Sequence, residues 1–316
     1  MFDLDGLRAA ADLVHKVVAP TPTHAWPLLA ARTGAQVFVK HENHTPTGAF
    51  KLRGGLTYID HLLRAGAPPK GLISATRGNH GQSLAFAGRR AGLKVAIVVP
   101  EGNSIEKNAA MRAFGAELIE SGRDFDAAVE TATSLAQERA WHRVPSFHPE
   151  LVRGVATYAL ELFEAVQDLD TVYVPIGLGS GICGLIHTRD LLGRKTEIVG
   201  VVAANADAYA QSFETGKLVT TASASTLADG MACRIPMEEA LTMIRKGAAR
   251  VVRVEEDEIK AAIRAYHEDT HNLAEGAGAA PLAALLRERD RQAGKRVGLI
   301  LTGANIDRMV YAGIVT

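Results

Sequence analysis

The chain alternates between two hydrophobic patterns. Short apolar runs typical of buried strands are followed by longer segments with apolar residues at helical spacing. The expected strands are residues 36–40, 71–75, 94–99, 116–120, 171–175, 197–202, 250–254 and 296–301. The expected helices are residues 4–18, 50–63, 80–91, 104–114, 124–139, 151–166, a helix from 182, 257–271 and 275–287. Because strands alternate with helices, the pattern predicts an α/β protein with parallel sheets.

Two segments interrupt this pattern. Residues 64–69 are rich in Gly, Ala and Pro, which predicts the end of a helix and a crossing between domains. Residues 203–248 are less periodic, and we expect short helices and a loop there. The regular block from residue 71 to about residue 149 is expected to form a small α/β unit of its own.

Composition narrows the class of ligand. The chain has 316 residues, with 35 Lys plus Arg and 35 Asp plus Glu, and it has no basic block. We therefore expect no nucleic-acid or membrane partner, and a small molecule as the ligand. Charged residues interrupt the apolar positions of residues 1–17, so we expect neither a signal peptide nor a membrane span there. We therefore expect a cytoplasmic location. Cys183 and Cys233 are too few for a disulfide framework and are expected to be buried.

Candidate chemistry lies where strands end, which is where ligands bind in open α/β sheets. In residues 45–54, Lys51 follows a turn on Pro46 and Gly48, and Phe50 can anchor the backbone in a core. A lysine held in this way is partly desolvated, can lose its proton near neutral pH, and can attack a carbonyl as an amine. A lysine at a helix start is more often an ordinary surface residue, so the assignment depends on the other loops.

Two other strand ends offer polar groups. In the turn at residues 74–82, backbone N–H groups and the Thr76 hydroxyl could receive a carboxylate, and Asn79 offers an amide donor. Asn and Gly also form turns without any function, so this signal is weak alone. The last expected strand ends at Thr302, whose hydroxyl could bind a ring nitrogen while remaining neutral.

The loop at residues 175–182 follows a strand and precedes a helix. Gly177, Gly179 and Gly181 expose successive backbone N–H groups, which suits a phosphate at a helix N-terminus. The spacing does not continue as a dinucleotide fingerprint, and no acidic residue ends the next strand. A P-loop is excluded because no Gly-Lys-Ser or Gly-Lys-Thr is present in the loop. The loop predicts a site for a smaller phosphorylated ligand, with a structural turn as the alternative.

One competing motif points to a different chemistry. His267, Glu268 and His271 match the zinc-protease helix pattern, and both imidazoles would share a face of the helix expected at 257–271. No further histidine continues the pattern at the metzincin spacing, and the surroundings are charged. A zinc hydrolase therefore remains an alternative hypothesis.

The four loops together supply the parts of a pyridoxal-phosphate site. On these motifs the chain resembles, over nearly its whole length, the fold-type II pyridoxal-phosphate enzymes, which share the fold of the tryptophan synthase β subunit. It is most similar to the threonine and serine dehydratases. The resemblance implies two three-layer domains. Residues 1–65 and 151–316 would form the large cofactor-binding domain, and residues 66–150 would form the small domain that carries the Asn79 loop.

The resemblance also implies roles for individual residues. Lys51 would form the Schiff base with pyridoxal 5'-phosphate and take the α-proton, Asn79 would bind the phenolic oxygen, and Thr302 would meet the pyridine nitrogen. The phosphate would be held by Gly177, Leu178, Gly179, Ser180 and Gly181. Phe50 and Glu275 would lie at the cofactor, and the implied substrate-binding residues are Thr76, Arg77, Gly78 and His80.

The implied reaction is β-elimination from a β-hydroxy L-amino acid, which releases a 2-keto acid and ammonia. The substrate would be threonine or serine, or an aryl analogue such as phenylserine. With only the Thr302 hydroxyl at the ring nitrogen, the cofactor is a milder electron sink, which favours elimination over transamination. A catalytically inactive cofactor-binding module is a further alternative, and the resemblance implies a homodimer.

Two departures from the family pattern refine this interpretation. In serine racemases and many related dehydratases, two carboxylates beside the strand at 197–202 bind a divalent cation. Val202 and Ala208 occupy those positions here, so no metal site is expected, although Asp207 lies nearby. Arg77 stands where racemases place a serine, and because a guanidinium does not deprotonate, racemisation is not expected. Arg77 could pair with the phosphate or the substrate carboxylate, or help admit a bulkier substrate, in a pattern that resembles the phenylserine dehydratases.

Overall fold

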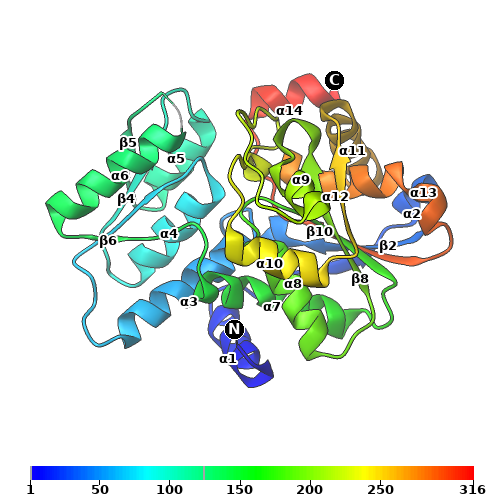
Figure 1. The fold of residues 1–316 in the computed structure, drawn as a ribbon, viewed down its shortest axis with the longest axis horizontal. Helices are drawn as coiled ribbons and strands as arrows, with labels where there is room; N and C mark the ends of the chain where they lie inside the picture. The colour runs from blue at the N-terminus through cyan, green and yellow to red at the C-terminus, as the bar shows by residue number, and fades with distance from the viewer. Residues whose placement is uncertain (1, 124) are drawn as a thin grey trace.

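The computed structural model describes residues 2–123 and 125–316 and contains two sheets (Figure 1). The six-stranded sheet has the order β1-β2-β10-β7-β8-β9. Its strands are β1 (Thr23–Ala25), β2 (Gln36–His41), β7 (Thr171–Pro175), β8 (Glu197–Ala203), β9 (Arg250–Val254) and β10 (Arg296–Leu301). The four-stranded sheet has the order β5-β4-β3-β6. Its strands are β3 (Leu72–Ala75), β4 (Val95–Val99), β5 (Glu117–Glu120) and β6 (His142–Arg143).

All neighbouring strands in the described residues run parallel except β1 and β2. The helices of the first half are α1 (Leu4–His15), α2 (Pro27–Thr33), α3 (Lys51–Arg64), α4 (Asn79–Arg90), α5 (Ile105–Ala113), α6 (Phe125–Arg139) and α7 (Pro149–Ala165). Those of the second half are α8 (Ser180–Leu191), α9 (Ala208–Thr215), α10 (Glu238–Gly247), α11 (Glu256–Thr270), α12 (Gly276–Arg287), α13 (Arg289–Gln292) and α14 (Arg308–Val315). Short 3-10 turns are η1 (Glu42–His44), η2 (Ala204–Ala206) and η3 (Asp229–Met231).

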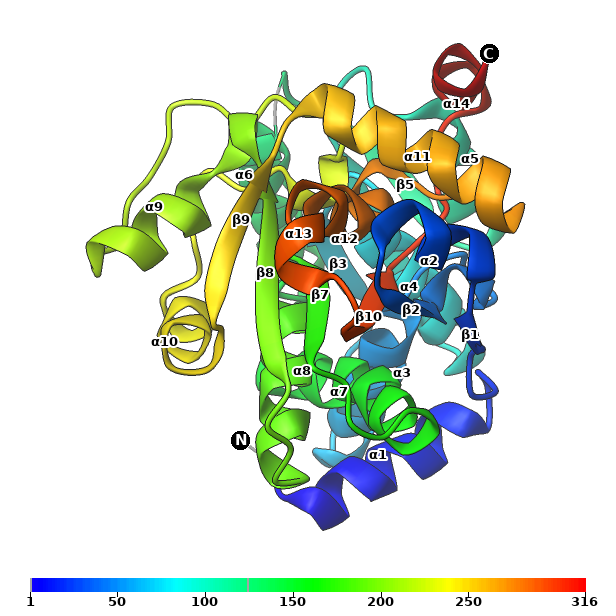
Figure 2. The same cartoon turned by 90° about the vertical axis from the view of Figure 1, so that its right-hand side faces the viewer.

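Each sheet is buried on both faces, as parallel strands require. Along β7, Val172 and Val174 pack with α7, α8 and α10, whereas Tyr173 faces the core beneath α11 and α12. Along β4, Ile97 packs toward α4 and α5, and Val98 packs toward α6. Because successive side chains of a strand point to opposite faces, these runs of apolar residues fill two cores at once. Figure 2 shows the six-stranded sheet between its helical layers.

The two sheets form two units joined low in the view of Figure 1 by α3 and α7. We call the smaller sheet with α4, α5 and α6 the four-stranded unit, and the larger sheet with its helices the six-stranded unit. The predicted α/β fold with mostly parallel sheets is confirmed. The predicted domain boundaries at residues 65 and 151 remain a prediction.

Several short elements differ from the sequence expectations. No strand was expected at β1, which pairs antiparallel with β2. No strand was expected at β6 and no helices were expected at α2 and α14, because these elements are too short to show a period. Helix α7 begins at Pro149. Proline suits this position because N–H groups in the first helical turn have no partner within the helix, so the N–H that proline lacks is not missed. The expected helix start at residue 124 lies outside the described residues.

Both cysteines are buried, as predicted: Cys183 on α8 and Cys233 after η3. In the described part of the chain, no helix has the length and apolar character needed to cross a membrane.

Candidate active site

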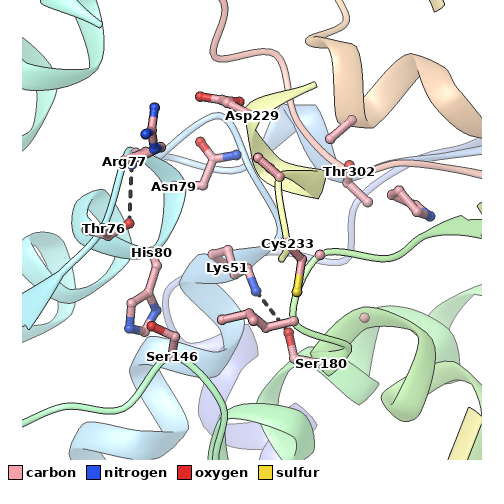
Figure 3. A pocket seen from close by; sticks show the side chains of 18 of the residues that line it. Lys51, Thr76, Arg77, Asn79, His80, Ser146, Ser180, Asp229, Cys233 and Thr302 are labelled. Carbon is pink, nitrogen blue, oxygen red and sulfur yellow. Dashed lines mark hydrogen bonds between the residues drawn. The ribbon is translucent and has the colours of Figure 1, made fainter. Parts of the chain in front are cut away.

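A cavity of about 160 Å³ lies between the two units, at the carboxyl ends of strands from both sheets (Figure 3). Its walls include residues 75–80 after β3, residues 175–181 after β7, and Thr302 after β10. All the residues that the sequence analysis assigned to a pyridoxal-phosphate site line this cavity: Phe50, Lys51, Thr76, Arg77, Gly78, Asn79, His80, Gly177, Leu178, Gly179, Ser180, Gly181, Glu275 and Thr302. The strand-end rule therefore located one common site.

The loop before Lys51 is fixed to the end of β10. The Phe50 N–H donates to the Thr302 carbonyl at 3.0 Å, and the Thr45 hydroxyl accepts from the Ala49 N–H at 2.9 Å. Gly48 has a φ of 67°, and a Cβ there would lie 2.8 Å from the Asn305 side-chain oxygen. These contacts place Lys51 at the first position of α3, pointing into the cavity.

Lys51 is held in a largely apolar setting. Its Nζ donates to Ser180 Oγ at 2.9 Å and lies 4.8 Å from the centre of the Phe50 ring. Burial disfavours the charged ammonium and lowers the pKa of Lys51 to about 8. About a tenth of this side chain is therefore an unprotonated amine at pH 7, and this is the state that attacks a carbonyl.

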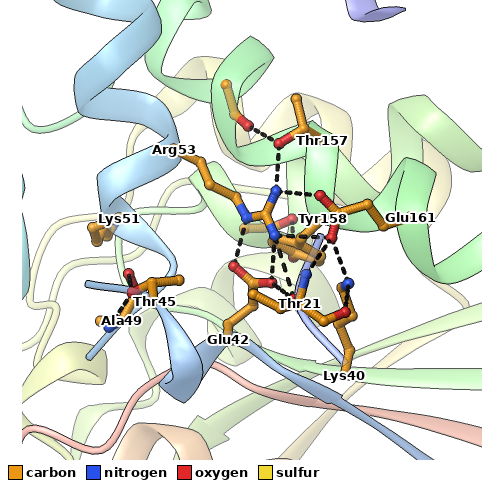
Figure 4. A network of polar contacts seen from close by, with 12 residues as sticks. Thr21, Lys40, Glu42, Thr45, Ala49, Lys51, Arg53, Thr157, Tyr158 and Glu161 are labelled. Atoms are coloured by element: carbon orange, nitrogen blue, oxygen red, sulfur yellow. Dashed lines mark hydrogen bonds and ion pairs between the residues drawn. The ribbon is translucent and has the colours of Figure 1, made fainter. Parts of the chain in front are cut away.

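The first turn of α3 is anchored by a buried network of charged residues (Figure 4). Arg53 makes paired contacts to Glu42 at 2.7 and 2.9 Å and to Glu161 at 2.6 and 2.9 Å. Lys40 Nζ donates to Glu161 at 2.5 Å, so two cations balance two carboxylates. Because buried charges are tolerated only when they are paired, this network holds the backbone of Lys51 between η1 and α7.

The glycine loop is shaped by close backbone contacts. A Cβ at Gly177 would lie 2.3 Å from the Gly230 carbonyl oxygen, and one at Gly179, whose φ is 99°, would lie 2.6 Å from Ala240 Cβ. The loop leads directly into α8, which begins at Ser180 and not at residue 182 as expected. The N–H groups of this first turn have no partner within the helix, and with the helix dipole they suit an anion such as phosphate.

Thr302 lies opposite this loop in the lining of the cavity. Its side chain is 2% exposed, and its hydroxyl has no hydrogen-bond partner among the described residues. Buried hydroxyls are normally paired, so an orphaned hydroxyl in a cavity wall suggests a ligand atom as its partner. A hydroxyl can bind a ring nitrogen without carrying charge.

Asn79 and Glu275 form a third wall. Asn79 Nδ2 donates to Glu275 Oε1 at 2.7 Å, and Asn305 Nδ2 donates to Asn79 Oδ1 at 2.8 Å. Glu275 is 2% exposed, and burial raises its pKa to about 7 although the nearby Lys107 ammonium opposes the rise. The charge of Glu275 is therefore sensitive to its neighbours near neutral pH.

The turn between β3 and α4 is compact. Thr76 Oγ1 accepts from the Gly78 N–H at 3.2 Å, and the backbone then enters α4 at Asn79. Burial, reinforced by the Lys51 charge, lowers the pKa of His80 to about 3, so this imidazole is neutral. Arg77, in contrast, is exposed and lines the opening of the cavity.

Several lining residues were not singled out by the sequence analysis: Lys107, Phe125, Ser146, Ala232 and Cys233. Lys107 gave no readable signal in the sequence, because it lies within α5, beyond the loop that follows β4. Asp229 lies in the poorly periodic segment 203–248, where no spacing argument applies.

The structure does not support the alternative hypothesis of a zinc site on α11. The helix ends at Thr270, and His271 lies beyond it with a left-handed φ of 52°, so the two imidazoles do not share one helix face. His267 Nδ1 contacts the Tyr311 hydroxyl at 3.0 Å, and Glu268 pairs with Arg32.

The region beside β8 is apolar where the family pattern would place a cation. Val202 and Ala208 are buried, and Asp207 pairs with Arg253 at 2.8 Å. Across residues 2–123 and 125–316, no group of three or more His, Cys, Asp or Glu side chains is arranged to hold a metal ion.

Comparison with known proteins gives the class of this chain. The profile of the family "Pyridoxal-phosphate dependent enzyme" matches residues 14–303, so the chain belongs to that family and its cofactor is pyridoxal phosphate. The L-threonine ammonia-lyase of Geobacter sulfurreducens is 36% identical over 302 residues, which are 95% of this chain and 75% of that protein. The L-threo-3-hydroxyaspartate ammonia-lyase of Saccharomyces cerevisiae is 30% identical over 308 residues, covering 97% and 94%.

A solved structure agrees with these relatives. The processed form of threonine deaminase isoform 2 from Solanum lycopersicum superimposes with a TM-score of 0.90 and 28% identity, covering 99% of this chain and 93% of that one. The fold-type II family and the fold predicted from the sequence are thereby confirmed.

Proposed function

We propose that this enzyme is an ammonia-lyase that removes the β-hydroxyl and the amino group of a β-hydroxy L-amino acid, giving a 2-keto acid and ammonia. The observation that carries the proposal is Lys51. A buried amine with a pKa of about 8 faces the same cavity as a phosphate-suited glycine loop and an orphaned neutral hydroxyl. The names of the two curated relatives, both ammonia-lyases, support the same reaction class.

The residues in the cavity fit pyridoxal phosphate by their chemistry. We propose that Lys51 binds it covalently, that the N–H groups of residues 177–181 hold its phosphate, and that Thr302 partners its ring nitrogen. Asn79 is proposed to bind its phenolic oxygen, with Phe50 and Glu275 alongside. When bound, the cofactor supplies a conjugated system that accepts negative charge from the α-carbon of the amino acid.

The protein groups then perform the proton transfers and hold the substrate. Once released, the Lys51 amine is proposed to take the α-proton, since its lowered pKa leaves it partly unprotonated at neutral pH. The N–H groups at the start of α4, with Thr76, Gly78 and His80, are proposed to hold the α-carboxylate. Thr302 offers a hydroxyl and not a carboxylate, so the ring nitrogen stays neutral, which favours elimination over transamination.

A second cavity bears on the choice of amino acid. It has a volume of about 420 Å³ and shares Arg77, Phe125, Leu178 and Asp229 with the first. We propose that this outer cavity receives the substrate side chain. Its volume and the apolar contribution of Phe125, Leu178 and Ile235 favour an aryl group, as in phenylserine, over the methyl group of threonine.

The organisation of the whole protein is also proposed. We propose a large domain of residues 1–65 and 151–316, a small domain of residues 66–150, a homodimer and a cytoplasmic location. Light scattering on the purified holoenzyme tests the dimer, and a monomeric mass would contradict it.

A panel of L-serine, L-threonine, L-threo-3-hydroxyaspartate and L-threo-phenylserine tests the reaction, with 2-keto acid and ammonia measured for each. Equal amounts of both products are expected, with the highest kcat/KM for phenylserine. Lys51→Ala should lower turnover by about 10³-fold or more because both the cofactor link and the base are lost. Cofactor binding without keto acid from any substrate would support an inactive binding module instead.

A further inference from the structure

Three charged side chains at the edge of the cavity have no role in the proposed reaction. Lys107 on α5 contributes its ammonium from the four-stranded unit, and Asp229 on η3 and Glu275 before α12 contribute carboxylates from the six-stranded unit. Lys107 Nζ lies 2.5 Å from Asp229 Oδ2 and 3.7 Å from Glu275 Oε2. Lys107 is 6% exposed and Glu275 is 2% exposed, so solvent screens these contacts poorly.

Glu275 connects this group to Asn79. An ionised carboxylate can only accept hydrogen bonds, so Glu275 Oε1 requires the nitrogen of the Asn79 amide. Asn305 donates to the Asn79 oxygen and to the Thr47 carbonyl, which fixes the same orientation from the other side. Asn79 Nδ2 carries a second hydrogen, and Asn79 lines the cavity that holds Lys51 (Figure 3).

The backbone is shaped around both charged side chains. A Cβ at Gly78 would lie 2.6 Å from Lys107 Cδ, and one at Gly303 would lie 2.5 Å from Glu275 Oε1. The lysine stem and the carboxylate therefore occupy space that a larger residue at either glycine would take.

The charge of Glu275 depends on a small number of neighbours. Burial raises its pKa to about 7, the Lys107 ammonium lowers it, and Asp229 raises it. Glu275 Oε2 has no hydrogen-bond partner among the described residues, and Lys107 is the cation beside it. Burial lowers the pKa of Lys107, but the carboxylates of Glu275, Asp229 and Asp307 outweigh this effect and raise it. Lys107 therefore stays charged.

We propose that Lys107 is a positioning residue that favours the ionised form of Glu275, and that ionised Glu275 orients and polarises the Asn79 amide toward the bound cofactor. The inference rests on the proposed place of Asn79 beside the cofactor. Lys107 and Glu275 belong to different units. The ionisation of Glu275 therefore depends on how closely the two units approach each other. The four-stranded unit thus influences the cofactor through the Lys107 ammonium as well as through Asn79 on α4.

The test is a pH titration of the visible absorbance of the holoenzyme, without any amino-acid substrate. The wild type should show a transition near pH 7. Lys107→Met should move its midpoint up by about one pH unit or more, because the opposing cation is lost, and Lys107→Arg should restore it. Asp229→Asn should move the midpoint down, because a neighbouring negative charge is lost. Lys70→Met, which removes an exposed lysine of the segment before β3, should leave it unchanged.

Two further variants make the result decisive. Glu275→Gln should abolish the transition, and adding Lys107→Met to Glu275→Gln should cause no further shift. The proposal is overturned if the wild type shows no transition or if Lys107→Met leaves the midpoint unchanged. It is also overturned if Lys107→Met shifts the midpoint equally with and without Glu275→Gln. If Lys107→Met does not fold, the test rests on Asp229→Asn, whose midpoint should fall, and on Lys107→Arg, whose midpoint should match that of the wild type. Since no substrate is present, this test can fail while the ammonia-lyase assay succeeds.

Discussion

At the scale of single residues, the chemistry depends on how each side chain is desolvated. The pKa of Lys51 is lowered to about 8 because burial penalises its charge, and its one polar contact, to Ser180, is uncharged. Arg53, two residues later, is fully buried and keeps its charge because Glu42 and Glu161 compensate it. Neighbouring positions on one helix therefore hold a nucleophile and a structural cation, and the difference lies in their partners.

The lowered pKa of Lys51 predicts how the apoenzyme takes up its cofactor. Only the unprotonated amine attacks the aldehyde, so the rate constant for uptake should rise with pH and level off above a midpoint near pH 8. Stopped-flow absorbance after mixing apoenzyme with pyridoxal phosphate at several pH values measures this. A midpoint near the ordinary lysine value of about 10.4 would show that the Lys51 ammonium is not desolvated.

At the scale of elements, the site is built from strand ends and the helix starts that follow them. The glycine loop between β7 and α8 shows what this requires, since its backbone must approach both η3 and α10 closely. Side chains there would block the N–H groups that the phosphate is proposed to use.

Gly179→Ala is expected to destabilise the protein and weaken cofactor binding together. Strain at the positive φ costs about 1–2 kcal/mol, and the contact with Ala240 adds to it. Gly193→Ala is the matched control, because Gly193 follows the same helix with a φ of 62°, and a Cβ added there would have no described atom within 4 Å. Chemical denaturation and cofactor titration compare the two variants. Equal losses of stability and affinity would mean that the loop contributes only a turn.

The sequence predicted the regular elements and the site loops for identifiable reasons. Strands such as β4 are continuous apolar runs, and Lys51, Thr302 and the glycine loop stand at strand ends, so chain order was enough to group them. β1 and β6 lacked a period because they are so short. Lys107 was missed because its ammonium becomes notable only beside Asp229 and Glu275, which lie more than one hundred residues away in the chain. That proximity is a property of the packing of the two units.

At the scale of the whole molecule, the buried network around Arg53 joins distant segments. It links Lys40 on β2, Glu42 on η1 and Glu161 on α7 with the helix that carries Lys51. The cavity thus depends on a charge arrangement outside it. Breaking one partner leaves a buried charge unpaired, which typically costs about 3–5 kcal/mol.

The pH dependence of stability should report this network. Glu161 is buried, but Arg53 and Lys40 outweigh the burial and lower its pKa to about 2, against about 4.3 in an unfolded chain. The contribution of ionised Glu161 to the free energy of unfolding is about 3 kcal/mol. It is complete above about pH 4.3 and is lost as the pH falls toward 2. Denaturant unfolding of the wild type and Glu161→Gln at several pH values measures it. The two proteins should differ most near neutral pH and converge in acid, and a constant difference would contradict this account.

The central claim is that Lys51 is the residue that bonds to pyridoxal phosphate. Borohydride reduction of the holoenzyme, followed by proteolysis and mass spectrometry, tests it most directly because reduction fixes the cofactor on the lysine that carries it. We predict the added pyridoxyl phosphate mass on the peptide that contains Lys51, and no label in Lys51→Ala. A label on Lys107 or any other lysine of the wild-type enzyme would contradict the account.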